Sequence, residues 1–320
     1  MKSNSRPFIE YLVHVHPLQI AFFSHFLIFT ISDDIDELDA VEEFDEDETK
    51  ANSTAALRQT KLLDSIHLAS TLTSEKRSSR REQGLRSLFK AITQYATGDT
   101  GREMIENALD EVILPFCFNG LRGGTSPAEQ YASCRVLEAT AILLGANQDD
   151  YAEGIAQKLI RVVKVTQRAS QVRGAALRAL AMAYFICATD VDSADGVLDL
   201  CEQVCATEFR NEVVPPSLRA AALDCWALLS TTIDNVYLAG DNIPGSGDGR
   251  GLIILPLLND CLNSTNLDLR CAAGECVALI HEARLDIGID KSAAGENLNA
   301  SDRRYRRGTY ICLGLRLLGF

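Results

Sequence analysis

The chain has 320 residues, of which 47% are hydrophobic and 7% are aromatic. This composition favours an aliphatic core of closely packed helices over a sheet, in which β-branched and aromatic residues are preferred. The net charge is −13, but residues 33–48 alone hold eleven acidic residues and no basic one. The first 32 residues carry +1, which leaves −3 for the 272 residues after position 48. The acidic balance therefore does not exclude a nucleic-acid partner.

An apolar run occupies residues 18–31 (LQIAFFSHFLIFTI). It is shorter than the ~20 residues that a membrane-spanning helix needs. Lys2 and Arg6 precede it, as in a signal peptide, but acidic residues follow it where a cleavage site would require small ones. We expect residues 1–32 to be either a targeting segment or the result of a gene-model error. Residues 33–60 are expected to form an acidic, disordered linker.

Regular helical patterning is predicted from near Leu62 to about residue 290, where helix-length apolar runs alternate with short breaks. One break, Ser126-Pro127-Ala128-Glu129, predicts a helix start, because the serine oxygen can accept an amide hydrogen and the glutamate can reach back. The longest break, residues 239–251, is rich in glycine. It lacks the lysine and hydroxyl residue of a phosphate-binding loop, and a disordered insertion is expected there.

Five segments of the chain place an arginine at the head of an alanine-rich apolar helix. Their arginines are Arg81, Arg135, Arg173, Arg219 and Arg270. The separations of 54, 38, 46 and 51 residues lie near the ~40–47 of HEAT and armadillo repeats, whose loops tolerate insertions. Helices this apolar must stack on neighbours. We therefore predict an all-α, armadillo/HEAT-like α-solenoid over residues 61–290, with the arginines bonded to neighbouring backbone or carboxylates.

No pattern in the sequence indicates catalysis, a cofactor or a metal site. The ten cysteines include no C-x-x-C pair, and several lie in alanine- and leucine-rich runs, where thiols behave as small hydrophobic groups. Cys201 and Cys205 lie one helical turn apart, but no histidine lies near them in sequence, so both are expected to be packing thiols. We expect a reducing compartment and a protein that is not an enzyme.

Three basic clusters are candidate contacts for a partner or for RNA. The first consists of Lys158, Arg161, Lys164 and Arg168, which are predicted to share one side of a helix, opposite its apolar face. The second consists of Lys76, Arg77, Arg80 and Arg81. The third, in a basic tail predicted to span residues 291–320, consists of Arg303, Arg304, Tyr305, Arg306 and Arg307. Arginines beside an aromatic ring suit RNA, although a solvated helix face also explains each cluster taken alone.

Two motifs, EKRSSRREQGLRSL at 75–88 and LDLRCAAGECVALIHEAR at 267–284, resemble the amino-terminal domain of the interferon-related developmental regulator family. The resemblance covers about residues 62–290, and SDRRYRR at 301–307 is similar to the basic segment before that family's carboxy-terminal domain, which is expected to be missing. The resemblance implies an α-solenoid without enzymatic activity, found in nucleus and cytoplasm. It implies transcriptional repressor complexes or the ribosome and its RNA as partners, with no cofactor, no small-molecule substrate and no membrane.

Two alternatives from other classes remain open. The first is a secreted or membrane-tethered repeat protein directed by residues 1–31, which would require disulfides, and the second is an enzyme with an unrecognised site. The second alternative would require a buried cluster of titratable groups.

Overall fold

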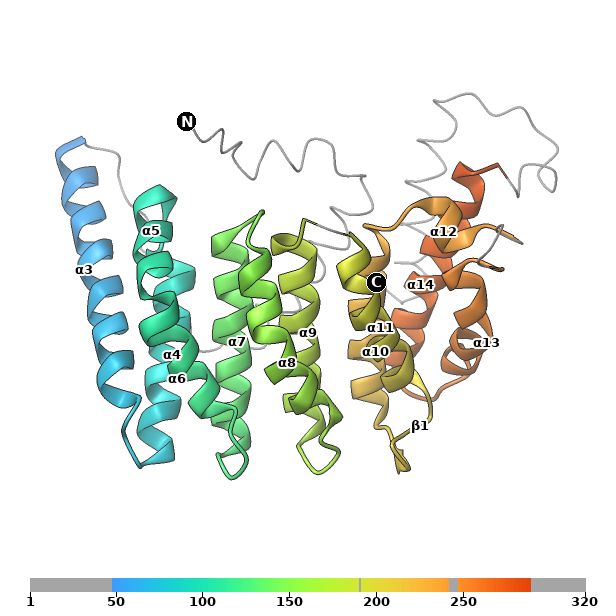
Figure 1. Ribbon diagram of the computed structural model, residues 1–320, viewed down its shortest axis with the longest axis horizontal. Coiled ribbons are helices and arrows are strands. Elements are labelled where there is room, and N and C mark those ends of the chain that lie inside the picture. The colour runs from blue at the N-terminus through green and yellow to red at the C-terminus, as the bar shows by residue number, and fades with distance from the viewer. Residues whose placement is uncertain (1–47, 190, 242–246, 289–320) are drawn as a thin grey trace. The chain divides into compact units, whose positions relative to one another are not determined.

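The computed structural model describes residues 48–189, 191–241 and 247–288, and this part of the chain is almost entirely helical (Figure 1). The predicted apolar segment 1–32 and basic tail 291–320 lie outside the described residues. The chain divides into two compact units, residues 1–193 and residues 194–320, which we call unit 1 and unit 2. Each unit is described by itself.

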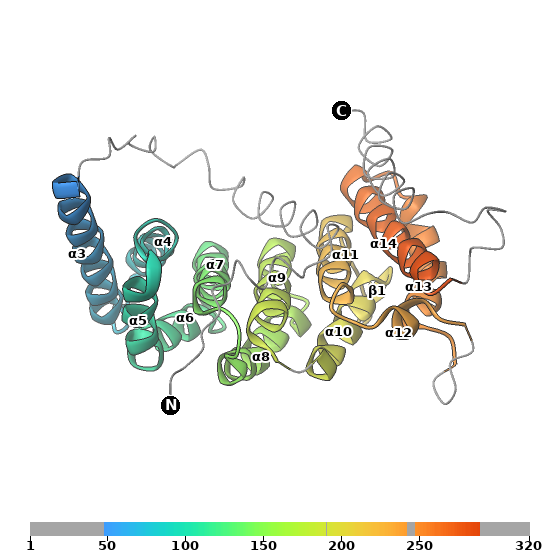
Figure 2. The ribbon, with the colours of Figure 1, turned by 90° about the horizontal axis from the view of Figure 1, so that it is seen from above.

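Unit 1 is a stack of helices that pack on one another in chain order. Its elements are α3 (Glu48–Leu72), α4 (Ser78–Tyr95), α5 (Gly98–Ala108), the π-helical turn η2 (Leu109–Ile113), α6 (Leu114–Gly120), α7 (Pro127–Leu144), α8 (Asp149–Lys164) and α9 (Ser170–Cys187). A short 3-10 turn, η3 (Val191–Ala194), follows α9. Seen from above, α4, α7 and α9 form one row, and α5, α6 and α8 lie on one side of it (Figure 2).

The first helix of unit 1 corrects the predicted linker. We expected residues 33–60 to be disordered, but α3 begins at Glu48, so residues 48–60 are helical. Residues 55–57 and 59–61 are exposed, whereas Leu62 and Ala69 are fully buried. The polar residues of this stretch therefore form the solvent-facing surface of a helix. Alanine, leucine, arginine and glutamine are strong helix formers even where few of them are buried.

The core of unit 1 is aliphatic, as the composition predicts. Leu85, Leu137 and Leu177 are fully buried, one in each helix of the row formed by α4, α7 and α9. Small residues allow the two layers to approach closely. A Cβ atom added to Gly120 in α6 would lie 2.1 Å from Oγ of Ser133 in α7, so any larger residue would require this serine side chain to move.

Unit 2 contains α10 (Asp195–Cys205), a hairpin of β1 (Glu208–Phe209) and β2 (Glu212–Val213), α11 (Pro216–Ser230), α12 (Asn235–Ala239), α13 (Arg250–Leu262) and α14 (Leu267–Asp286). The two strands are antiparallel, with Glu208 opposite Val213 and Phe209 opposite Glu212. Helix α11 packs on α10 and on α14, and α14 also packs on α12 and α13. The largest fully buried side chain of unit 2 is Trp226, which lies in α11.

The polar contacts of unit 2 converge on the acidic face of α10. Arg250, the first residue of α13, pairs with Asp195, with Asp199 and, at 2.7 Å, with Glu202. The indole N–H of Trp226 donates to the same glutamate at 2.9 Å. These bonds join α10, α11 and α13 into one unit.

The structure confirms the predicted all-α, armadillo/HEAT-like α-solenoid class, because successive helices pack as neighbours within each unit. The sequence predicted one repeat domain over 61–290 and did not predict the division after residue 193. Among the described residues, no helix is both long and apolar enough to cross a bilayer.

Candidate nucleic-acid interface

The predicted arginines cover the carboxyl ends of helices. Four of them, Arg81, Arg173, Arg219 and Arg270, are each the fourth residue of their helix, in α4, α9, α11 and α14. Each donates to a carbonyl within three residues of the end of the preceding helix. The acceptors are the oxygens of Glu75 at 2.7 Å, Val163 at 2.9 Å, Cys205 at 2.7 Å and Ser264 at 2.8 Å. The last carbonyls of a helix lack intrahelical partners and carry partial negative charge, so a cation there is stabilising.

The repeat register needs one correction, at α7. The fourth residue of α7 is Gln130, not Arg135, and its amide donates to the oxygen of Thr125 at 2.9 Å. The Gln130 side-chain oxygen accepts from Arg168 at 2.7 Å, and the same guanidinium donates at 2.9 Å to the oxygen of Leu121, the residue directly after α6. Gln130 and Arg168 of the next turn therefore make the contacts that a single arginine makes in the other repeats. With Gln130 in place of Arg135 the repeat separations become 49, 43, 46 and 51 residues.

Arg135 has a different role, inside unit 1. Its guanidinium pairs with Glu138 at 2.8 Å, both side chains being almost fully buried, and lies 4.8 Å from the centre of the Phe89 ring. The sequence pattern placed Arg135 in the repeat series because alanines and leucines surround it. However, Arg135 lies more than one turn after the fourth residue of α7, the position from which the other arginines reach the end of the preceding helix.

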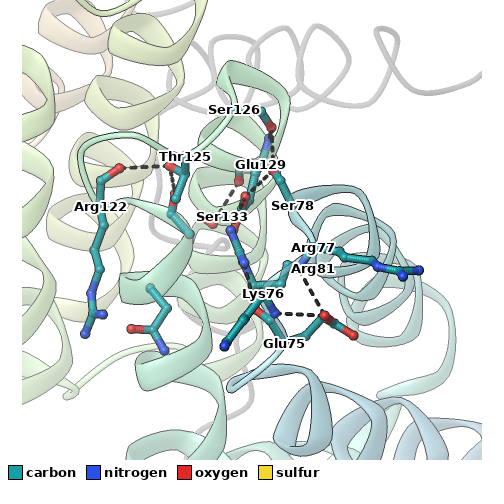
Figure 3. Close-up of polar contacts among 12 residues, drawn as sticks. Glu75, Lys76, Arg77, Ser78, Arg81, Arg122, Thr125, Ser126, Glu129 and Ser133 are labelled. Atoms are coloured by element: carbon teal, nitrogen blue, oxygen red, sulfur yellow. Dashed lines mark hydrogen bonds and ion pairs between the residues drawn. The ribbon is translucent and has the colours of Figure 1, made fainter.

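A buried ion pair fixes the turn between α3 and α4 (Figure 3). Arg81 donates two hydrogen bonds to Glu129 of α7, at 2.6 and 3.0 Å, and the Ser78 hydroxyl donates to the same carboxylate at 2.6 Å. The predicted helix start is confirmed in its first half, because Ser126 accepts from the Glu129 amide at 3.1 Å. The glutamate side chain, expected to reach back to its own helix start, instead faces α4.

Glu75 organises the rest of this turn. Its carboxylate accepts the amide hydrogens of Lys76 at 2.8 Å and Arg77 at 3.0 Å, and it pairs with Arg80 at 3.3 Å. The pKa of Glu75 lies below its ordinary value, chiefly because of the hydrogen bond from the Arg77 amide. Lys76, Arg77 and Arg80 are all exposed, with 60% of the Arg80 side chain accessible. Three residues of the second predicted cluster therefore face solvent, whereas the fourth, Arg81, is mostly buried and paired with Glu129.

The first predicted cluster lies on α8, with one change. Lys158, Arg161 and Lys164 are exposed on α8, and the predicted apolar residues on its other side are buried. The Lys158 ammonium lies 5.7 Å from the centre of the Phe118 ring in α6. Arg168 lies beyond the last helical residue, and its guanidinium is held by α7 and by the end of α6. The helical stripe therefore ends at Lys164.

The turns α3–α4, α6–α7 and α8–α9 lie along the same edge of unit 1, the lower edge in Figure 1. The hydroxyls of Ser78 and Ser126 are 3.2 Å apart, which joins the first two turns, and the bond from Arg168 to Leu121 joins the last two. Exposed basic side chains follow this edge, and we call them the basic edge. They are Lys76, Arg77, Arg80, Arg122, Arg161 and Lys164.

Sequence reasoning missed Arg122, which lies in the turn between the two clusters and points away from Glu129 (Figure 3). A lone arginine next to two glycines carries no recognisable signal. Its position in the turn after α6, next to a second turn rich in basic residues, becomes apparent only in the fold.

The helix ends add to the positive potential of this edge. Helices α4, α7 and α9 begin here, and helix amino termini carry partial positive charge. Helices α3, α6 and α8 end here, and Arg81, Arg168 and Arg173 each bond one carbonyl at or just after these helix ends. These guanidinium groups oppose the partial negative charge of the helix ends, so the exposed cations and helix starts dominate the potential met by an approaching anion.

The third predicted cluster, Arg303 to Arg307 with Tyr305, lies outside the described residues. Across the described ranges 48–189, 191–241 and 247–288, no group of three or more His, Cys, Asp and Glu side chains could hold a metal ion. The nine cysteines within these ranges are free thiols.

Stacked helix pairs with covered helix ends define a helical-repeat protein of the α-solenoid class. Comparison with known proteins shows which family it is. The interferon-related developmental regulator family matches residues 29–317, so the chain belongs to this family. The match confirms the resemblance found in the sequence and extends it on both sides.

One curated relative is interferon-related developmental regulator 2 of Mus musculus, which is 28% identical over 226 residues. The match covers 68% of this chain and 48% of the mouse protein, so the chain spans about half the length of that relative. Among solved structures, an engineered protein covers 80% of this chain, and 98% of its own chain is matched, with a TM-score of 0.46 and 15% identity. That likeness is too distant to support an inference.

Proposed function

We propose that this chain is a non-catalytic adaptor that regulates gene expression by binding the ribosome through the basic edge of unit 1. Membership of a family of developmental regulators supports the general kind of role. The observation that carries the proposal is the position of the two exposed basic clusters, with Arg122 between them, on one edge where three helices also begin.

The chemistry of this edge suits a phosphate backbone. Its cations are long, exposed side chains on turns and on the ends of helices, and buried bonds such as that of Arg81 with Glu129 hold this edge in place. Arginine and lysine that neutralise phosphates release condensed counterions, so binding of this kind falls steeply as salt rises. A surface of this kind recognises charge and shape rather than base sequence, as expected for an A-form RNA helix, whose bases are poorly accessible.

Ribosome co-sedimentation across salt tests the proposal. Two charge-reversal variants test the surface: one changes three cations of the basic edge, and the other changes Arg161 and Lys164 of that edge together with Lys158, which is exposed on α8. The variants are Lys76→Glu/Arg77→Glu/Arg122→Glu and Lys158→Glu/Arg161→Glu/Lys164→Glu. Each is expected to weaken co-sedimentation at low salt and to reduce the slope of log affinity against log salt by about 2, as the loss of three phosphate contacts requires. The matched control, Lys61→Glu/Arg86→Glu/Arg102→Glu, changes the net charge equally outside the basic edge.

Two results contradict the proposal. One is co-sedimentation of both edge variants equal to that of the unmodified chain between about 50 and 200 mM salt. The other is an equal loss in the control variant, which would mean that net charge alone drives binding.

The second candidate partner is a transcriptional repressor assembly. An acidic protein surface could meet the same exposed cations. Affinity capture from native lysate, followed by mass spectrometry, separates the two: ribosomal proteins lost in both edge variants support the proposed role, and repressor subunits lost in both edge variants replace it with a nuclear one.

A further inference from the structure

Two buried thiols of unit 2 lie within contact distance. Cys205 is the last residue of α10 and Cys261 is the next-to-last residue of α13, 56 positions further along the chain. Their sulfur atoms are 3.8 Å apart, and both residues have no exposed surface. A disulfide requires about 2.05 Å, so the two sulfurs must approach by about 1.8 Å for the bond to form.

The arginine that covers the end of α10 also contacts this pair. Arg219 donates from Nε to the carbonyl of Cys205 at 2.7 Å and from Nη2 to the sulfur of Cys261 at 3.1 Å. The guanidinium is permanently charged, and a cationic donor beside a thiol favours the thiolate, the reactive form of cysteine. This contact differs from that of the equivalent Arg270, for which the bond is to the Ser264 carbonyl.

We propose that Cys205 and Cys261 are a redox-active dithiol, which a peroxide or a low-molecular-weight disulfide closes into an intramolecular disulfide between α10 and α13. With a peroxide, the Cys261 thiolate attacks one oxygen and breaks the O–O bond, which gives a sulfenic acid and releases the other oxygen as hydroxide or alkoxide, and this anion takes a proton from solvent water. The sulfur of Cys205 then attacks the sulfenic sulfur, the thiol loses its proton, and water leaves. Two thiols are oxidised by two electrons, and the peroxide is reduced.

The charges around Cys261 determine which thiol reacts first. The hydrogen bond with Cys205 and the charge of Arg219 lower the pKa of Cys261 to about 7, against the opposing effects of burial and of Asp260 on the same helix. The bond raises the pKa of Cys205 instead, and burial and the nearby Cys276 of α14 act in the same direction. The thiolate form is therefore favoured at Cys261, and Cys205 keeps its proton.

The other buried thiols lack this chemistry. Burial raises the pKa of Cys134 and of Cys187 to about 12, and it also raises the pKa of Cys201. Their thiolate fractions at neutral pH are very small. Oxidation is therefore expected at the pair formed by Cys205 and Cys261 before these positions.

The oxidant reaches the pair when the end of α13 opens. Pro256 lies inside α13 and has no amide hydrogen, so the helix lacks one of its internal bonds near its middle. Local opening of such a segment costs less than unfolding of the whole unit. Once formed, the disulfide closes a loop of more than 50 residues, and it should reduce the population in which α10 and α13 separate by roughly 100-fold.

Disulfide mapping of the full chain tests the dithiol itself. The reduced protein is exposed to diamide or hydrogen peroxide at neutral pH, then alkylated, digested without reductant and analysed by mass spectrometry. The expected product is a peptide pair that joins Cys205 to Cys261, absent from Cys261→Ser. The proposal is overturned if this pair stays alkylated while the half-buried Cys271 is oxidised, or if the link forms only in denaturant.

A rate measurement tests the positioning role of Arg219. Arg219→Gln should slow disulfide formation about tenfold at pH 7 and move the midpoint of its pH profile upward, because the thiolate loses its cationic donor. Arg173→Gln is the matched control: it also loses a bond to a helix-end carbonyl, but this carbonyl, that of Val163, lies in unit 1. Equal rates in the two variants would show that Arg219 does not activate Cys261.

Discussion

Replacing Arg81 with methionine should destabilise unit 1 by an amount that the geometry sets. Glu129 has no exposed surface, 14% of the Arg81 side chain is exposed, and two hydrogen bonds join them. Removing one partner of a buried ion pair costs about 3–5 kcal/mol, because the other charge stays buried. The Ser78 hydroxyl continues to donate to Glu129, which offsets part of this cost. We expect a loss of about 2–4 kcal/mol.

The assay must report on unit 1 alone. The single tryptophan, Trp226, lies in unit 2, so its fluorescence does not follow the loss. Hydrogen exchange of the α4 and α7 amides measures local stability directly, and a loss of 2 kcal/mol lowers protection about 30-fold. Arg86→Met is the matched control on the same helix, because its pair with Glu82 is exposed and should contribute less than about 0.5 kcal/mol.

A second substitution separates the buried charge from the loss of packing. Adding Glu129→Met to Arg81→Met should recover much of the loss, since an apolar pair often replaces a buried ion pair at little cost. The bond from Arg81 to the Glu75 carbonyl is not recovered, so restoration is incomplete. The reasoning is refuted if Arg81→Met lowers protection no more than Arg86→Met does. It is also refuted if the double variant is as unstable as the single one.

Two further predictions concern glycine packing and pH. Gly154→Ala in α8 should raise the free energy of unfolding by about 0.5–1 kcal/mol, because there is open space around the new Cβ. Gly101→Ala in α5 should lower the free energy of unfolding by about 1–3 kcal/mol, because the new Cβ would lie 2.7 Å from a backbone atom. Denaturant unfolding followed by hydrogen exchange checks that the two changes have opposite signs. The pKa of Asp149 lies below its ordinary value, chiefly because its carboxylate accepts a hydrogen bond from the Thr189 amide at 2.7 Å. The contribution of Asp149 to folding stability is therefore complete above about pH 4 and is lost as the pH falls through the lowered pKa of the folded state. A carboxyl titration by NMR with a midpoint at or above about 3.9 contradicts this assignment.

The fold class could be predicted from the sequence because its signal is local and repeated. An apolar helix headed by an arginine recurs along the chain, and stacking is the one way to bury such helices. The exposure of Lys158, Arg161 and Lys164 also follows from local periodicity, since three residues at this spacing share one side of a helix. Their use by a partner stays a prediction, because it depends on a second molecule.

Other features depend on residues far apart in sequence. The contact between Cys205 and Cys261 spans 56 positions, and no local pattern distinguishes these two from the remaining cysteines. The sequence pattern assigns the repeat position in α7 to Arg135, because this arginine lies among alanines and leucines. The structure assigns it to Gln130, since Arg168 supplies the guanidinium from the next turn. Gln130 and Arg168, which are neighbours in space, together make the bonds that the sequence pattern attributes to a single arginine.

The arginine at the fourth position of a helix makes the same structural bond in both units but contributes to different chemistry in each. At each fourth helical position the guanidinium makes one constant bond, to the carbonyl end of the preceding helix. A guanidinium has further donors, and these are free to meet whatever the next helix presents. For Arg81 the second partner is Glu129, and the result is a fixed turn that holds exposed cations. For Arg219 the second partner is the sulfur of Cys261, and the result is an activated thiol. A change in the second partner alone would therefore alter function while the bond that builds the solenoid is kept.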